Sequence, residues 1–182
     1  MKFERTRIPD IILVKPKLFG DARGYFFESF EKKKFAEGGI DFDFVQDNQS
    51  RSMRHAVRGL HYQVQQAQGK LVRVVEGAVF DVAVDVRRSS PTFGQWVGTV
   101  LDDKEHHMLW IPPGFAHGFS VLSDTAVFCY KCTDYYAPQH ERSIRWDDPD
   151  LGIDWALPAG VEPVLSAKDA NGGRFRDAEH FP

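Results

Sequence analysis

Two short apolar runs flank a Pro-Pro-Gly turn in the stretch MLWIPPGFAHGFSVL, residues 108–122. Proline fixes its own φ angle and glycine accepts backbone conformations closed to other residues, so residues 112–114 predict a tight turn. Short apolar runs bounded by such turns are typical of β-strands. The stretch therefore predicts strands over Met108–Ile111 and Gly118–Leu122, with one imidazole, His117, beside the second.

The same alternation of short apolar runs and turn residues continues in both directions along the chain. Gly77 separates two predicted strands, and residues 89–92 separate two more. Many short strands with regular turns predict an all-β sandwich or barrel. The other predicted strands are Ile11–Pro16, Gly24–Phe27, Phe42–Ser50, Val57–Gln63, Leu71–Glu76, Ala78–Val86, Trp96–Leu101, Ala126–Thr133 and Ser143–Trp146.

Helical patterning is confined to one short segment near the N-terminus. It predicts a helix from Ser29 to Glu37, with Ser29 as N-cap and Gly38-Gly39 as the stop signal. From about Asp147 onward, proline and glycine predict a loop-rich tail that packs over one end of the barrel. No linker or repeat divides the chain, so we expect one domain over residues 1–182.

Composition excludes several classes of protein. Among 182 residues, 23 Lys plus Arg face 26 Asp plus Glu, which gives a formal charge of −3 and argues against a nucleic-acid or anionic-membrane binder. Hydrophobic residues make up 42% of the chain, enough for a packed core. No apolar run approaches the roughly 18 residues of a membrane span, and the charged start is unlike a signal peptide. We expect a cytoplasmic protein.

The pattern Pro113-Gly114-Phe115-Ala116-His117 resembles the second motif of cupin barrels, in which a Pro-Gly turn delivers a histidine into the barrel. Metal-dependent cupins also carry a His-x-His pair and a glutamate, whereas this chain offers His61 alone in the corresponding region. Two imidazoles without a carboxylate make a poor metal site, so no metal is predicted. Cys129 and Cys132 have C-x-x-C spacing, but their apolar surroundings favour buried thiols over a redox or zinc site.

A small β-barrel can hold one small ligand among its inward-facing side chains. On the strand Val57–Gln63, His61 shares a face with Gly59, while Arg58 lies on the opposite face. Both side chains can line one pocket only if the strand is bulged near Gly59. On a neighbouring predicted strand, Gln46 and Asn48 share a face, as polar specificity groups would.

An imidazole such as that of His61 can remove a proton from carbon when a carboxylate fixes its tautomer. The negative charge then needs a carbonyl to accept it, and Lys70 or Arg58 could stabilise the resulting oxyanion. The phenol of Tyr130, on the other side of a ring, could return the proton. Each residue also fits a plain structural role in the core or at the surface, and spacing alone does not name a reaction.

Longer stretches, taken together, closely resemble the dTDP-4-dehydrorhamnose 3,5-epimerases. They cover most of residues 10 to 170 in the family's order, which makes the resemblance far more specific than the cupin-like motif. The matching stretches are residues 19–29 (FGDARGYFFES), 44–50 (FVQDNQS), 58–63 (RGLHYQ), 68–73 (QGKLVR), 80–85 (FDVAVD), 90–96 (SPTFGQW), 110–119 (WIPPGFAHGF), 130–136 (YKCTDYY) and 165–169 (LSAKD).

The resemblance implies a cofactor-free isomerase on a cupin-type jelly-roll barrel. It converts dTDP-4-dehydro-6-deoxy-D-glucose to dTDP-4-dehydro-L-rhamnose by inverting C3 and C5, both next to the C4 ketone. By position, His61 matches the general base and Asp169 its carboxylate partner. Lys70 matches the residue beside the C4 oxygen, and Tyr130 matches the general acid that reprotonates C5.

The family's substrate-binding residues also have counterparts in this sequence. The positions are Arg23, Glu28, Gln46, Asp47, Asn48, Arg58, His117, Glu141 and Lys168. Arg23 and Glu28 lie in an N-terminal arm that the family exchanges with a second subunit, so we expect a homodimer. Three alternatives stay open: an epimerase acting at a single carbon of a related dTDP-4-keto sugar, a non-catalytic sugar-nucleotide-binding cupin, and a metal-dependent cupin dioxygenase.

Overall fold

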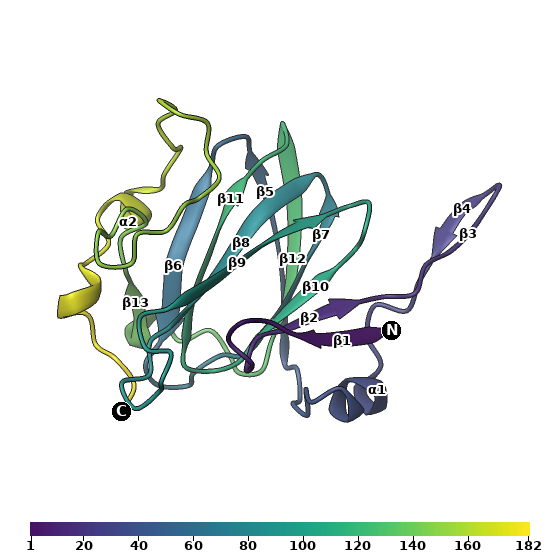
Figure 1. Ribbon diagram of the computed structural model, residues 1–182, viewed down its shortest axis with the longest axis horizontal. Coiled ribbons are helices and arrows are strands. Elements are labelled where there is room, and N and C mark those ends of the chain that lie inside the picture. The colour runs from purple at the N-terminus through teal and green to yellow at the C-terminus, as the bar shows by residue number, and fades with distance from the viewer.

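Two antiparallel β-sheets pack face to face in the computed structural model, which describes all residues 1–182 (Figure 1). One sheet has six strands in the order β1-β2-β10-β7-β12-β5, and the other has five in the order β13-β6-β11-β8-β9. The strands are β1 Lys2–Arg5, β2 Ile12–Lys15, β3 Phe19–Asp21, β4 Gly24–Phe26, β5 Gln46–Met53, β6 Val57–Gln63, β7 Lys70–Glu76, β8 Ala78–Asp85, β9 Trp96–Asp102, β10 Met108–Ile111, β11 Phe115–Val121, β12 Thr125–Cys132 and β13 Glu141–Ser143. The predicted all-β, jelly-roll fold is confirmed.

Two of the predicted strands start at other residues in the structure, one because of a glycine turn and one because of aromatic packing. The strand predicted over Gly118–Leu122 begins earlier, at Phe115, because the turn is complete at Gly114, which has a φ of 95°. The strand predicted from Phe42 begins only at Gln46. Phe42 and its neighbour Phe44 instead pack on Trp110, with ring centroids 5.0 and 5.9 Å from the indole. The short strands β1 and β3 were not predicted.

Helix α1 spans Lys32–Glu37, so the prediction that it starts at Ser29 is wrong. Glu31 is the N-cap instead, and its carboxylate accepts hydrogen bonds from the amides of Lys33 and Lys34 at 3.1 and 2.9 Å. Phe30 stays outside the helix and packs on Phe35, with ring centroids 4.8 Å apart. This hydrophobic staple fixes the entry of the chain into α1.

The main core lies between the two sheets and follows the alternation of side chains along each strand. On β8, Val79 and Ala83 point inward and are fully buried, while Val82 and Val84 point to the outer face of the five-stranded sheet. Phe119 and Phe128 meet from opposite sheets, with stacked rings 4.3 Å apart. Both rings also line a cavity between the two sheets.

The tail after β13 covers the outer face of the five-stranded sheet, so the prediction that it packs over a barrel end is wrong (Figure 1). Leu151, Trp155 and Phe175 are buried against the outward-facing residues of β6 and β8. The tail contains helix α2, Ala167–Ala170, and the short 3-10 helix η2, Phe175–Asp177. The tail follows the outer face of the five-stranded sheet because that face is apolar, and burying apolar side chains against it is favourable.

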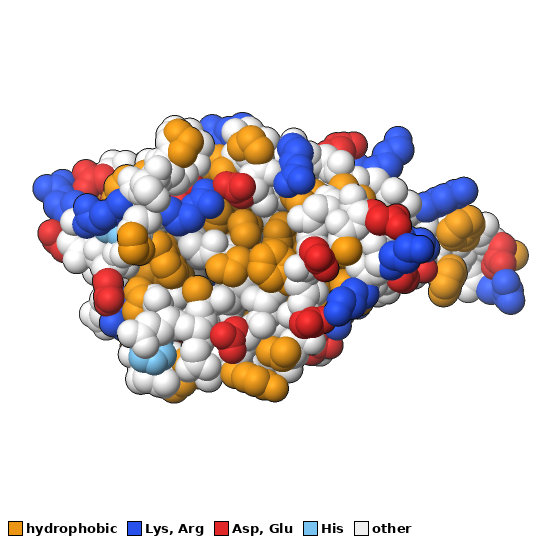
Figure 2. Space-filling model, turned by 90° about the horizontal axis from the view of Figure 1, so that it is seen from below, with side chains coloured by type: hydrophobic (Ala, Val, Ile, Leu, Met, Phe, Trp, Pro, Cys, Tyr) orange, Lys and Arg blue, Asp and Glu red, His pale blue; other side chains and the backbone are white.

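A hairpin of β3 and β4 projects from the body as an arm (Figure 1). Its aromatic side chains are largely exposed, at 54% for Phe19, 59% for Tyr25 and 69% for Phe26. Figure 2 shows hydrophobic side chains on this projection beside charged ones. Neither α1 nor α2 has the length and apolar character that a membrane-spanning helix requires.

Candidate active site

Strand β6 carries an extra residue opposite β11, and this irregularity shapes the site. His61 pairs with His117 and Arg58 pairs with Phe119, so the register shifts between these two pairs. The bulge predicted near Gly59 is therefore present. Gly59 has a φ of 114°, and a Cβ atom there would lie 2.6 Å from the Gly118 backbone. The shift allows Arg58 and His61 to line the same cavity, which a regular strand would prevent.

His61 meets a carboxylate from the tail. Its Nε2 lies 2.7 Å from Oδ1 of Asp169, and the two side chains are 23% and 4% exposed. This short contact with the imidazole is one of the causes that lower the pKa of Asp169. Nδ1 of His61 has no protein partner, and the residue borders both halves of the cavity. This nitrogen is the one free to take a proton.

Asp169 is fixed by the start of helix α2. Ser166 is the N-cap: its hydroxyl accepts a hydrogen bond from the Asp169 amide at 3.1 Å and donates one to Oδ2 of Asp169 at 2.6 Å. The Gly59 amide donates to Oδ1 at 3.1 Å. Burial opposes ionisation of Asp169, but its contacts with His61 and Ser166 outweigh burial and lower its pKa to about 2. The carboxylate is thus charged at neutral pH.

Lys70 and Tyr130 face His61 from the other sheet. They lie on the paired strands β7 and β12, and the Lys70 Nζ is 5.9 Å from the centre of the Tyr130 ring. Burial lowers the pKa of Lys70, while Cys132, Glu141 and Asp81 oppose that shift. Burial also raises the pKa of Tyr130, which keeps its phenol protonated. A ligand between the sheets would have a base on one side and a proton donor on the other.

The space around these residues consists of two adjoining cavities of about 280 and 360 Å³. Six residues border both cavities: Asn48, His61, Lys70, Tyr130, Tyr136 and Glu141. Of the residues predicted to bind substrate, six line one or both cavities. They are Gln46, Asn48, Arg58, His117, Glu141 and Lys168. Lys168 Nζ pairs with Oε2 of Glu141 at 2.9 Å.

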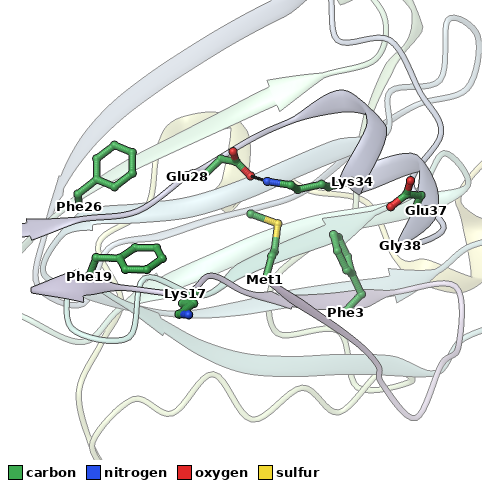
Figure 3. Close-up of a pocket in the computed structure, with 9 residues that line it drawn as sticks. All are labelled: Met1, Phe3, Lys17, Phe19, Phe26, Glu28, Lys34, Glu37 and Gly38. Carbon is green, nitrogen blue, oxygen red and sulfur yellow. Dashed lines mark hydrogen bonds and ion pairs between the residues drawn. The ribbon is translucent and has the colours of Figure 1, made fainter.

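Three residues predicted to bind substrate lie elsewhere in this chain. Asp47 points to the opposite face of β5 from its neighbours and pairs with Lys131 at 3.0 Å. Arg23 is at the tip of the arm, with a side chain 89% exposed and paired to Asp21. Glu28 borders a separate cavity of about 530 Å³ between the arm and α1, where it pairs with Lys34 at 2.7 Å (Figure 3).

Sequence reasoning missed several residues that complete the site. Asp81 is fully buried, and its Oδ2 lies 2.9 Å from Nε2 of His117. A charged residue at an inward position of the apolar stretch 78–86 was the available signal. Ser166 and Tyr136 also escaped notice. Ser166 occupies the first position of a capping-box pattern, whereas nothing in the local sequence marks Tyr136 as a cavity residue.

A sequence model of the family dTDP-4-dehydrorhamnose 3,5-epimerase matches residues 5–177. The chain belongs to this family. A dTDP-4-dehydrorhamnose 3,5-epimerase from Pseudomonas aeruginosa is 58% identical and covers 100% of both chains. The resemblance inferred from the sequence motifs is thereby confirmed.

Solved structures of epimerases share the fold closely. A dTDP-6-deoxy-D-glucose-3,5-epimerase from Legionella pneumophila, in complex with dTDP-4-keto-L-rhamnose, is 53% identical, with a TM-score of 0.93 over 98% of this chain and 94% of that one. A 3'-monoepimerase from Streptomyces bikiniensis, in complex with dTDP-quinovose, is 36% identical, with a TM-score of 0.88 over 97% of this chain and 88% of that one. The backbone alone therefore does not separate double from single epimerisation.

The two cysteines and the adjacent histidines His106 and His107 were the other candidates for a redox or metal site. Both cysteines are free thiols, and Cys129 and Cys132 point to opposite faces of β12. No cluster of three or more His, Cys, Asp or Glu side chains has the geometry to hold a metal ion. His106 and His107 lie in the connection between β9 and β10.

Proposed function

We propose that this chain catalyses the 3,5-epimerisation of dTDP-4-dehydro-6-deoxy-D-glucose to dTDP-4-dehydro-L-rhamnose, a step toward dTDP-L-rhamnose. The observation that carries the proposal is the placement of His61, with its Asp169 partner, across a polar cavity from Lys70 and Tyr130. A base and a protonated phenol on opposite sheets are what inversion of a carbon centre requires. Family membership favours the same reaction.

Each inversion begins with removal of the proton on C3 or C5 by His61. The electron pair of the broken C–H bond moves into the adjacent carbon–carbon bond, and the C4 carbonyl becomes an enolate. Lys70 borders the cavity, and its protonated amine would stabilise that oxygen. The enolate then collapses to the ketone as a proton returns from the other face, from Tyr130 at C5 and from solvent water at C3. The substrate's own ketone accepts the electrons, so we propose that no cofactor takes part.

The rest of the substrate is a nucleotide diphosphate, which needs cationic and polar partners. Arg58 and Lys168 border the cavity beside His61, and an arginine fork matches phosphate oxygens. Gln46, Asn48 and the remaining cavity residues supply hydrogen-bonding groups, whereas Asp47 pairs with Lys131 on the opposite face of β5. These assignments are proposals that substitution of each residue can test.

We propose a homodimer in which the arm of one subunit reaches the site of the other. Phe19, Tyr25 and Phe26 expose more than half of their surfaces, which is costly for an isolated chain in water. Arg23 and Glu28 lie far from the His61 cavity of their own subunit, and exchange would bring them to that of the partner. Two free thiols fit a reducing, cytoplasmic location.

The second candidate function is epimerisation at C3 alone. It is favoured by the similarity to the 3'-monoepimerase, whose fold matches this chain over nearly its full length. The double reaction needs a proton donor at C5 as well, and Tyr130 is placed to serve as one. A sugar-nucleotide binder without activity is disfavoured by the set His61, Asp169, Lys70 and Tyr130, since binding alone needs no base paired with a carboxylate.

One experiment separates these functions. The chain is incubated with dTDP-4-dehydro-6-deoxy-D-glucose in deuterated water, and the product is examined by NMR. We expect deuterium at both C3 and C5 with inversion at each carbon. Deuterium at C3 alone would establish the monoepimerase, and tight binding without exchange would establish the binder.

A further inference from the structure

One wall of the cavity is an irregular segment, residues 133–137, which connects β12 to η1, Pro138–His140. Tyr136 projects from it and borders both cavities beside His61. Its phenol donates a hydrogen bond to Oε2 of Glu141 at 3.3 Å. The segment belongs to no strand, so its backbone groups need partners other than a β-ladder.

For residues 134–137 the partners include side-chain amides of three glutamines from different parts of the fold. Gln63, the last residue of β6, is 4% exposed. Its Nε2 donates to the carbonyl oxygens of Gln66 and Tyr135 at 2.7 and 3.2 Å, and its Oε1 accepts from the Ala137 amide at 2.9 Å. Its amide is thus fully engaged with backbone groups and has little left to offer a ligand.

The other two glutamines hold the neighbouring positions. Gln46 accepts a hydrogen bond from the Tyr136 amide through Oε1 at 2.9 Å, and its Nε2 donates to Asn48 Oδ1 at 3.1 Å. Gln68 donates through Nε2 to the Asp134 carbonyl at 2.8 Å. We call Gln46, Gln63 and Gln68 the glutamine clamp. Four consecutive residues, Asp134 to Ala137, each have one backbone group bound by the clamp.

We infer that Gln63 is a positioning residue that presents Tyr136 to the substrate by holding the backbone on both sides of it. The inference rests on the proposed function, because it requires a substrate in the cavity that Tyr136 borders. Because the segment 133–137 is already fixed in the free protein, substrate binding does not have to order it and avoids that entropy cost. The clamp therefore acts on substrate affinity more than on the proton transfers at His61.

The first test needs no substrate. The Tyr136 and Ala137 amides are bound by Gln46 and Gln63 side chains alone, so their hydrogen–deuterium exchange reports on the clamp. Gln63→Met keeps the length of the side chain and removes its hydrogen bonds. We expect exchange at these amides to rise by about tenfold or more, as loss of buried hydrogen bonds implies. Unchanged exchange at these amides would show that Gln63 does not hold this part of the backbone.

The matched control is Gln95→Met, which alters an exposed glutamine in the turn before β9 whose only side-chain contact is a 3.5 Å hydrogen bond to the Pro91 carbonyl. It should leave exchange of residues 134–137 at the wild-type rate. Because Gln63→Met could unfold the chain, Gln68→Met serves as a milder variant. It removes the single donation to Asp134, and we expect a smaller change in the same direction.

The second test is kinetic and uses dTDP-4-dehydro-6-deoxy-D-glucose with the full chain. Gln63→Met should raise KM by about tenfold while kcat changes by no more than about threefold, the pattern of lost binding. In a Tyr136→Ala background the same substitution should have no further effect on KM, because the ring that it positions is gone. Additive effects would mean direct binding or general destabilisation, and either result would overturn the positioning role.

Failure of the two proposals can be told apart. If the wild-type chain does not turn over this substrate, the proposed function fails, while amide exchange still tests the clamp. If the wild type turns over normally and Gln63→Met leaves KM unchanged, only the positioning role fails.

Discussion

The interior of the barrel holds two histidine–aspartate pairs that are built in opposite ways. His117 and Asp81 come from neighbouring strands of one sheet, and both are nearly or fully buried. His61 is partly exposed to the cavity, and its partner Asp169 comes from outside the sheets. Oδ1 of Asp81 has no hydrogen-bond partner, whereas both oxygens of Asp169 accept hydrogen bonds from Gly59 and Ser166.

This difference suits the His61–Asp169 pair to proton exchange with a substrate. It suits the buried His117–Asp81 pair to a structural role. A base must reach its substrate and regain a neutral state each cycle, so its carboxylate is best held by other donors as well. A buried pair whose carboxylate depends on one imidazole for a hydrogen bond is costly to disturb, because either partner alone would be an uncompensated buried group. We therefore expect His61 to control rate and His117 to control stability and substrate placement.

The largest expected effect is on catalysis at the exposed pair. His61→Ala should lower turnover by about 10² to 10⁴, the usual contribution of a general base, and should remove deuterium exchange at both C3 and C5. The fold should survive, since the imidazole is at the cavity edge. Exchange measured by NMR and melting measured by circular dichroism would check both points.

His107→Ala is the control for that substitution, because it removes an imidazole in the β9–β10 connection remote from the cavity. It should retain wild-type turnover. Persistent exchange at C3 in the His61 variant would assign the base to another residue and would break the contrast between the two pairs.

The buried pair should dominate stability. His117→Leu leaves the Asp81 carboxylate without its partner, and we expect the free energy of unfolding to fall by about 3–5 kcal/mol. Replacing both residues with leucine should recover a large part of that loss, because no buried group is then unpaired. Urea denaturation of the single and double variants tests this, and a double variant no better than the single one would contradict it.

The third expected effect is a dependence of stability on pH that arises from Asp169. The pKa of Asp169 is lowered to about 2 from its model-compound value of 3.8, so its ionised form stabilises the fold above about pH 4. That contribution, about 2 kcal/mol, is lost as the pH falls through 4 toward 2. Asp169→Asn should flatten this part of the stability profile measured by urea denaturation. A variant profile parallel to that of the wild type would show that Asp169 does not contribute.

The smallest effect concerns the helix that carries Asp169. Ser166→Ala removes the N-cap of α2 and one hydrogen bond to the carboxylate, which should cost about 1 kcal/mol. Activity should fall as well, because Asp169 loses a constraint. Glu31→Ala removes the cap of α1, away from the cavity, and should lower stability to a similar extent without lowering kcat. Equal activity losses in both variants would argue that the α2 cap has no special role.

Much of the fold followed from local patterns in the sequence. The Pro-Pro-Gly turn and the alternation of apolar runs placed most strands, because both depend on neighbours in the chain. The errors arose where contacts over long sequence distances decide the outcome. Phe44 leaves the predicted strand to pack on Trp110, and Phe30 leaves the predicted helix to pack on Phe35. The tail followed the apolar outer face of a sheet, which no local pattern reveals.

The candidate site was predictable to a different degree for each residue. Alternation predicted the bulge near Gly59 only on condition that Arg58 and His61 share a pocket, since the two side chains otherwise face apart. The pairing of Asp169 with His61 rested on family resemblance, because more than a hundred residues separate them. Asp81 and Gln63 escaped prediction because their importance lies in hydrogen bonds to distant partners. Local sequence carries no record of such contacts.

Asp169 reaches His61 from α2, outside the two sheets. The strands that hold the base and the helix that supplies its carboxylate are therefore separate parts of the fold. A barrel lacking α2 would still present an imidazole among the same strands, stripped of the charge that primes it. Small carboxylates such as formate could then substitute for the missing side chain, as an external switch. By the same logic, replacing residues 166–170 alone offers a route to new proton chemistry, because Leu151, Trp155 and Phe175 then still bury the outer face of the sheet.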